Sequence, residues 1–140
     1  MKKPLAASAA LVTALLAAPA LAAGSGLPTP NRQGDVAYLT GGATADEART
    51  IEREADRYSL TLELVRKAQP ADLPAGNVKV SIRDAATGKV VLDTATDGRY
   101  LLAQLPAGRY VVATERGSDL KTQRVTLDGR HPDRLLFSWK

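Results

Sequence analysis

The stretch "DGRYLLAQLPAGRYVV", Asp97–Val112, contains the tripeptide Gly-Arg-Tyr twice, ten residues apart. The dipeptide Asp-Gly is a strong signal for a tight hairpin turn, because glycine reaches positive φ at little steric cost. The "LPAG" at residues 105–108 has the pattern of a β-turn with proline at its second position. Each Gly-Arg-Tyr therefore follows a turn and begins a strand. We expect both tyrosines to cover the end of a core and both arginines to point outward.

The same pattern continues on both sides of this stretch. From Leu60 onward, short segments with alternating hydrophobic and polar residues recur at roughly ten-residue spacing, separated by turns rich in Gly, Asp and Pro. No helical pattern follows Tyr58, which argues against a fold of alternating strands and helices. We predict a mainly β fold, an antiparallel β-sandwich of about seven strands. The side chains expected to meet in its interior are Val80, Ile82, Leu102, Tyr110 and Phe137.

One amphipathic helix is predicted before these strands, over residues 44–58. Thr44 followed by Glu47 has the pattern of a capping box, in which each side chain satisfies a free backbone N–H of the first turn. The opposite face of the helix is charged and is expected to lie in solvent. The apolar stripe consists of Ala48, Ile51, Ala55 and Tyr58.

The first residues have the pattern of a secretory signal peptide. Two lysines precede an Ala/Leu/Val run, and "ALA" at residues 20–22 is a typical cleavage signature. A membrane anchor is the alternative, because the apolar run approaches the ~20 residues that a span requires. The alanine content, Pro19 and the cleavage signature favour removal, so we predict cleavage after Ala22. The predicted organisation is a signal peptide (1–22), a flexible linker (23–37) and one sandwich domain (38–140).

Composition and charge narrow the class of protein. Cleavage would leave 118 of the 140 residues, the size of one domain, and would lower the formal net charge from +4 to +2. This weak charge gives no reason to expect nucleic acid as a partner. The chain has no cysteine, so no disulfide can form. A cysteine-free exported chain fits the bacterial periplasm or a secreted location, with no membrane span left after cleavage.

The sequence offers few residues for catalysis. His131 is the only histidine, and a metal site built from it and two nearby aspartates would have fewer His or Cys ligands than is usual. A Ser-His-Asp site would have to combine His131 with Ser81, Ser118 or Ser138, and no nucleophile-elbow motif is present. We interpret His131 as a turn residue, and predict no enzyme activity, no metal and no cofactor.

The stretch "TDGRYLLAQLPAGRYVVATERGSDLKTQRVTL" resembles the Asp-Gly-x-Tyr … Leu-Pro-x-Gly-x-Tyr pattern of carboxypeptidase regulatory-like domains. The resemblance runs from Tyr38 to Trp139. It implies the prealbumin-like β-sandwich of transthyretin, seven-stranded and antiparallel, here with one N-terminal helix. Domains of this kind resemble non-catalytic interaction or structural modules, although one fold hosts many functions.

Three functions follow as hypotheses. The first is a non-catalytic exported (periplasmic) module that binds another cell-envelope component, a protein or a glycan, by its strand faces, loops or a sheet edge. The second is a glycan- or polyanion-binding protein that uses outward arginines and an exposed aromatic residue. An exported hydrolase comes third. The residues predicted to contact a ligand or partner are Arg99, Arg109, Arg124 and Trp139.

Overall fold

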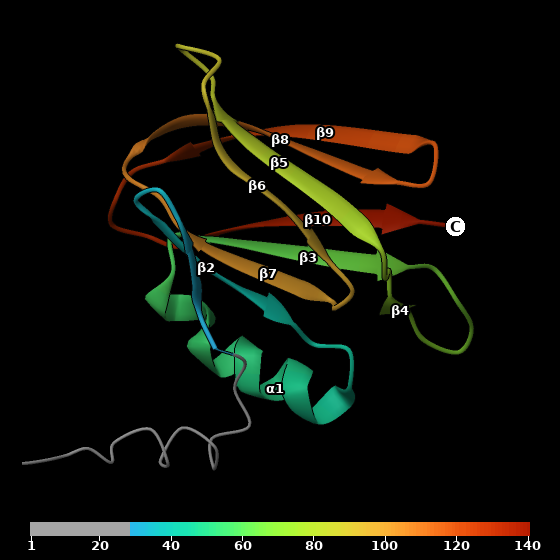
Figure 1. Ribbon diagram of the computed structural model, residues 1–140. Helices are drawn as coiled ribbons and strands as arrows, with labels where there is room; N and C mark the ends of the chain where they lie inside the picture. The colour runs from blue at the N-terminus through green and yellow to red at the C-terminus, as the bar shows by residue number, and fades with distance from the viewer. Residues whose placement is uncertain (1–28) are drawn as a thin grey trace, which may run out of the picture.

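The computed structural model describes residues 29–140, which form two β-sheets packed face to face and one short α-helix (Figure 1). The predicted signal peptide and residues 23–28 of the predicted linker lie outside the described residues. The fold is mainly β and sandwich-like, as predicted, but the prediction of about seven strands is wrong because residues 29–140 alone form ten. In chain order the elements are β1 (Asn31–Gln33), β2 (Val36–Gly41), α1 (Ala45–Glu54), η2 (Ala55–Arg57), β3 (Leu60–Arg66), β4 (Leu73–Pro74), β5 (Val78–Asp84), β6 (Val90–Thr96), β7 (Tyr100–Gln104), β8 (Gly108–Arg116), β9 (Asp119–Leu127) and β10 (Asp133–Trp139).

The strands form two sheets of different size. Sheet A has the order β1-β2-β7-β3-β10, with β4 paired to β3, and sheet B has the order β6-β5-β8-β9. The predicted antiparallel arrangement holds for every pair except β3 and β10, which run parallel from Leu60↔Asp133 to Arg66↔Trp139. All four strands of sheet B lie between β3 and β10 in the chain, so this pair joins distant segments.

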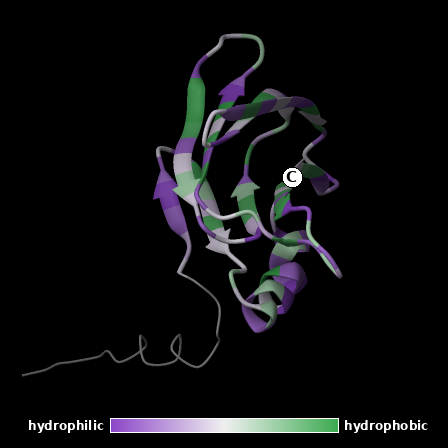
Figure 2. Ribbon diagram, turned by 90° about the vertical axis from the view of Figure 1, so that its right-hand side faces the viewer, coloured by the Kyte–Doolittle hydropathy of each residue, from purple (hydrophilic) through white to green (hydrophobic). Residues whose placement is uncertain are grey.

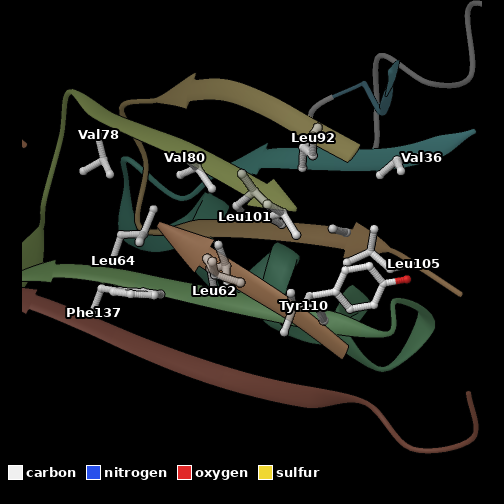
Figure 3. Close-up of a cluster of buried hydrophobic side chains, with 14 of the residues drawn as sticks. Val36, Leu62, Leu64, Val78, Val80, Leu92, Leu101, Leu105, Tyr110 and Phe137 are labelled. Atoms are coloured by element: carbon white, nitrogen blue, oxygen red, sulfur yellow. The ribbon is translucent and has the colours of Figure 1, made fainter. Parts of the chain in front are cut away.

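The main hydrophobic core lies between the two sheets (Figure 3). Four of the five predicted interior residues lie in it: Val80, Ile82, Tyr110 and Phe137. The prediction for Leu102 is wrong. Leu101 faces this core, so Leu102, the next residue along β7, points to the opposite side of sheet A.

On that opposite side, helix α1 packs against sheet A (Figure 1). Thr44 caps the first turn as predicted, with its Oγ1 accepting from the Glu47 N–H at 3.2 Å. The other half of the predicted capping box differs, because the Glu47 carboxylate accepts from the backbone N–H groups of Gly42 and Ala43. Ile51 is fully buried against Leu39 and Leu102, and the predicted apolar stripe contacts the sheet. Hydrophilic residues occupy the rest of the helix, as Figure 2 shows. The helix is shorter than predicted and is not N-terminal in the domain, because β1 and β2 precede it.

Strand β1 and the first residues of β2 lie within the segment that we predicted to be a linker. The Gln33 side chain binds the backbone of Asp93 in β6 twice. Its Oε1 accepts from the Asp93 N–H at 2.6 Å, and its Nε2 donates to the Asp93 carbonyl at 3.0 Å. A side-chain amide thus occupies the place of a neighbouring strand at one point on the edge of sheet B.

Gly98 is required for a reason other than the one predicted. Its φ is not positive, but a Cβ atom at this position would lie 2.0 Å from the carbonyl oxygen of Gly41. The turn into β7 therefore needs glycine because the end of β2 passes very close to it.

In residues 29–140, no helix has the length and apolar character needed to cross a membrane.

Candidate functional site

The outer face of sheet B, which points away from the core, has no helix or strand packed over it within residues 29–140 (Figure 1). Strand alternation decides which side chains point there, and they come from β5, β6, β8 and β9. We call this surface the sheet B face. Its central side chains are Ser81, Arg83, Arg109, Val111, Thr122 and Arg124.

Three arginines surround one valine at the middle of the sheet B face. Arg83 and Arg124 are the register partners of Val111 on its two sides, and Arg109 lies two residues before it in β8. With strands about 4.8 Å apart, the backbones at Arg83 and Arg124 are separated by roughly 10 Å. Val111 is only 5% exposed although it faces outward. Long arginine stems cover apolar surface in this way while their charged ends stay in water.

We call these residues the arginine cluster (Arg83, Arg109 and Arg124). All three side chains are exposed, and no carboxylate of the described chain lies within ion-pairing distance of them. The cluster therefore presents positive charge without an ion-pair partner on an uncovered surface, and the nearest interaction with an acidic group is between Arg109 and Asp84, whose pKa the arginine helps to lower. Such an arrangement attracts anionic groups and binds carboxylate or phosphate through the paired N–H donors of guanidinium.

The structure brings together two of the predicted contact residues, Arg109 and Arg124, and separates Arg99 from them. Arg99 precedes β7 in sheet A, whereas Arg109 belongs to β8 in sheet B. Sequence reasoning missed Arg83. Its signal was present, because Arg83 alternates with the core residues Val80 and Ile82 along one strand.

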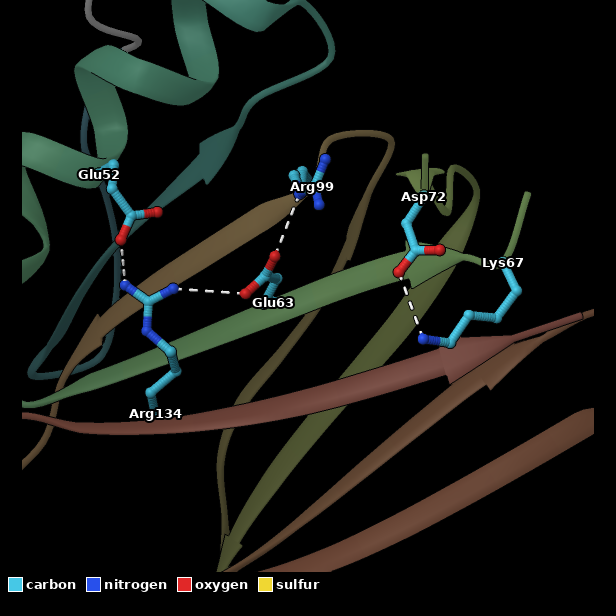
Figure 4. A network of polar contacts seen from close by, with 6 residues as sticks. All are labelled: Glu52, Glu63, Lys67, Asp72, Arg99 and Arg134. Carbon is cyan, nitrogen blue, oxygen red and sulfur yellow. Dashed lines mark hydrogen bonds and ion pairs between the residues drawn. The ribbon is translucent and has the colours of Figure 1, made fainter. Parts of the chain in front are cut away.

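Arg99 belongs to an ion-pair chain on the outer face of sheet A (Figure 4). Its Nε lies 3.1 Å from Glu63 Oε2, and the other Glu63 oxygen lies 3.3 Å from Arg134 Nη1. Arg134 also pairs with Glu52 of helix α1. Two carboxylates thus alternate with two guanidinium groups, and the chain ties the helix to β3 and β10. The charge of Arg99 is compensated within the fold.

The pKa values of Tyr100 and of Glu52 in this ion-pair chain are both shifted by their surroundings. Burial raises the pKa of Tyr100, and the neighbouring Glu52 and Glu63 carboxylates add to the rise, to about 12. Burial also opposes the charged form of Glu52. Its pKa is nevertheless below the usual value, because the Tyr100 hydroxyl and the Arg134 guanidinium favour the ionised carboxylate.

Trp139, the predicted aromatic contact, is 3% exposed and lies in the core with its ring centre 6.5 Å from that of Phe137. Leu135, Phe137 and Trp139 alternate along β10 and pack into or against the same core. Trp139 therefore does not offer an exposed ring to a ligand. Its Nε1 is buried and has no hydrogen-bond partner within the described chain.

His131 lies in an exposed loop, with its Nδ1 2.9 Å from Asp128 Oδ2. The hydrogen bond to Asp128 raises the pKa of His131 and lowers that of Asp128. Ser59 lines the same 110 Å³ hollow as His131. Its hydroxyl is already engaged within the fold: it donates to the backbone carbonyls of Ala103 and Leu105, and it accepts from the Leu105 N–H at 2.7 Å. Across residues 29–140, no three His, Cys, Asp or Glu side chains gather as a metal site would require.

No protein-family model matches the chain, and no curated protein matches it significantly.

Proposed function

We propose that the protein is a non-catalytic exported module, periplasmic or secreted, that binds another cell-envelope component through the sheet B face. The observation that carries the proposal is the arginine cluster around Val111, whose charges have no carboxylate partner on a surface that no other element covers. Arginine is enriched at the energetic centres of protein interfaces, where a guanidinium can use both its charge and its flat surface.

The likeness to carboxypeptidase regulatory-like domains supports a binding role. In this proposal the two sheets are a variant of the prealbumin-like sandwich, extended by the β1–β2 hairpin and by β4. The two Gly-Arg-Tyr segments begin β7 and β8, which lie in opposite sheets. The export signal predicted for residues 1–22 supports a location in the envelope.

Site-specific photocrosslinking in intact cells tests the proposal. A photoreactive residue replaces Thr122, which is exposed on the sheet B face next to Arg124. The control places the same residue at Arg49, which is exposed on helix α1. We expect one dominant covalent adduct from position 122 and none from position 49, and mass spectrometry of the adduct identifies the partner. Equal adducts at both positions, or none at position 122, would contradict the proposal.

An anionic polymer, including an acidic glycan, is the second candidate partner. The arginine cluster favours it, because each guanidinium can bind an anionic group without displacing an internal carboxylate. Binding would depend on the arginines alone, since Trp139 is buried. A heparin column distinguishes this candidate from a protein partner. If the partner is an anionic polymer, retention of the protein on the column should fall steeply between about 0.05 and 0.5 M salt, because salt screens the attraction between exposed arginines and the polymer.

A further inference from the structure

A second surface suited to a ligand is a hollow of about 610 Å³ at the end of the sandwich where β8 turns into β9. The end of β10 and the segment after β3 reach the same end of the molecule (Figure 1). We call it the β9–β10 hollow. Its volume falls within the roughly 300–1,000 Å³ of ordinary ligand pockets. It lies apart from the arginine cluster, at the other end of strand β8 from Arg109.

Four cations and one carboxylate line the β9–β10 hollow. The cations are Lys67, Arg116, Lys121 and Lys140, and the carboxylate is Asp119. Arg116, Lys121 and Lys140 have no carboxylate within ion-pairing distance in residues 29–140. Lys67 Nζ lies 3.3 Å from Asp72 Oδ2 in a largely exposed pair. The lining side chains therefore carry a net charge of +3, or +2 when Asp72, the partner of Lys67, is counted with them, which favours an anion with more than one charge.

Arg116 is held in place for such a ligand. Its Nε donates to the backbone carbonyls of Ala75 at 2.9 Å and Gly76 at 3.3 Å. These bonds occupy the Nε–H and fix the guanidinium plane, so the terminal N–H groups need little further ordering to bind an oxyanion. Lys121 lies on the core-facing side of the edge strand β9, opposite the fully buried Thr114.

Ser138 and Trp139 complete the lining. Trp139 points into the sandwich like Phe137, whereas Ser138 alternates to the other face of β10. In the described chain, Trp139 Nε1 is the only buried side-chain nitrogen or oxygen without a hydrogen-bond partner. An indole nitrogen can only donate, and buried donors in native proteins are nearly always paired. The nitrogen itself is covered from solvent, so a ligand in the hollow lies near the indole, and its oxygen accepts from this N–H only once a covering group moves aside.

We propose that the β9–β10 hollow binds a phosphate monoester group, as carried by a sugar phosphate or by an anionic lipid headgroup, with Arg116, Lys121 and Lys140 as its charged donors. This site is additional to the sheet B face and does not depend on it. A phosphate monoester matches the net +3 lining better than a single carboxylate, because it carries close to two negative charges at neutral pH and several acceptor oxygens.

Trp139 makes the site directly observable, because it is the only tryptophan in the chain. Its indole N–H gives a single cross-peak in a ¹⁵N-labelled sample. The probes are inorganic phosphate and glucose 6-phosphate at constant ionic strength, with chloride and unmodified glucose as controls. We expect the indole cross-peak to shift and saturate with the two phosphates and to remain unchanged with the controls.

The matched variants are Lys121→Gln in the hollow and Lys89→Gln in the exposed turn between β5 and β6. Each removes one positive charge. Lys121→Gln should weaken phosphate binding about tenfold or more, as is usual for the loss of a charged hydrogen bond, and Lys89→Gln should leave it within about twofold. Lys140→Gln provides the same test at an exposed position if Lys121→Gln does not fold.

Vesicles distinguish the two sources of phosphate. Saturation by glucose 6-phosphate without binding to phosphatidic acid vesicles supports a soluble ligand, and binding to these vesicles but not to phosphatidylcholine supports a lipid headgroup. Absence of any saturable indole shift, or equal weakening by Lys121→Gln and Lys89→Gln, would overturn the proposal. Failure of the photocrosslinking at position 122 would refute the proposed function without affecting the indole signal.

Discussion

Helix α1 covers part of the outer face of sheet A, whereas no element of the described chain covers the outer face of sheet B. Both faces carry arginines. On sheet A, Arg99 and Arg134 share the carboxylates of Glu63 and Glu52. On sheet B, the arginine cluster has no such carboxylates. The same residue type therefore stabilises the fold on one face and remains available to a partner on the other.

This difference between the two faces predicts different effects of substitutions on folding stability. Half-buried charges that are paired inside a fold contribute to its stability, and removing one partner leaves the other poorly compensated. Exposed and unpaired charges contribute little to folding, so their substitution leaves stability almost unchanged. Comparing matched substitutions on the two faces therefore separates residues that maintain the fold from residues that bind.

The largest contrast is expected for the hydrophobic residue at the centre of each face. Ile51→Ala removes a fully buried side chain between α1 and sheet A and should lower the free energy of unfolding by about 2–5 kcal/mol. Val111→Ala on the sheet B face should lower the free energy of unfolding by about 1.5 kcal/mol or less, because the substitution shortens the side chain by only two carbon atoms. Urea unfolding followed by circular dichroism measures both. Equal losses would contradict the proposed difference between the faces.

The second contrast concerns charge. Glu63→Gln removes the carboxylate that Arg99 and Arg134 share and should lower stability by about 1 kcal/mol, at the upper end of values for partly exposed pairs. Arg109→Gln on the sheet B face should change it by less than about 0.5 kcal/mol. Thermal unfolding at low and high salt measures the two variants, and only the Glu63→Gln difference should shrink with salt. A larger loss for Arg109→Gln would show an internal role for that residue.

A third prediction concerns alkaline pH. The pKa of Tyr100 is raised to about 12, so this tyrosine should ionise well above the ordinary tyrosine pKa of 10.0. Because the folded-state pKa exceeds the unfolded value of 10.0, stability is fully present below pH 10 and is lost as the pH rises toward 12. Absorbance at 295 nm follows the titration, and Tyr100→Phe should reduce the tyrosine ionisation seen near pH 12. An unchanged titration near pH 12 in Tyr100→Phe would refute this assignment.

The smallest effect is expected in the loop of His131. The hydrogen bond to Asp128 raises the pKa of His131, so Asp128→Asn should return it toward 6.5. The stabilising contribution of His131 is present below pH 6.5 and is lost as the pH rises through its folded pKa, whereas that of Asp128 is present above pH 3.8 and is lost as the pH falls. NMR titration of the only histidine in the chain measures the shift. Asp133→Asn is the control, because the charge of Asp133 raises the pKa of His131 less than Asp128 does, so its removal should change that pKa less.

The sequence correctly predicted the features of helices and strands that depend on interactions between residues close together in the chain. Thr44 caps α1 as expected, and Val80 and Ile82 alternate into the core. The Tyr110 hydroxyl donates to the Pro106 carbonyl at 2.8 Å, as expected for a tyrosine at the rim of a core. Each of these features involves contacts that a short segment specifies by its own periodicity or capping pattern.

The features that the sequence did not predict depend on long-range pairing. The two Gly-Arg-Tyr segments are alike locally, but β7 pairs with β2 and β3, whereas β8 pairs with β5 and β9. As a result Tyr110 lies between the sheets and Tyr100 lies under the helix. One signal was visible: residues 100–103 are consecutively apolar, which is typical of a strand covered on both faces.

The central claim is that the arginine cluster, and not positive charge in general, engages the partner. The most direct test compares the adduct formed at position 122 in two triple variants of equal charge. One changes Arg83, Arg109 and Arg124 to Gln, and the other changes Arg49, Arg53 and Arg57 of the α1–η2 segment to Gln. We predict that the first variant loses most of the adduct while it stays folded, and that the second retains it. Retention of the adduct by the first variant, or equal loss in both, would contradict the account.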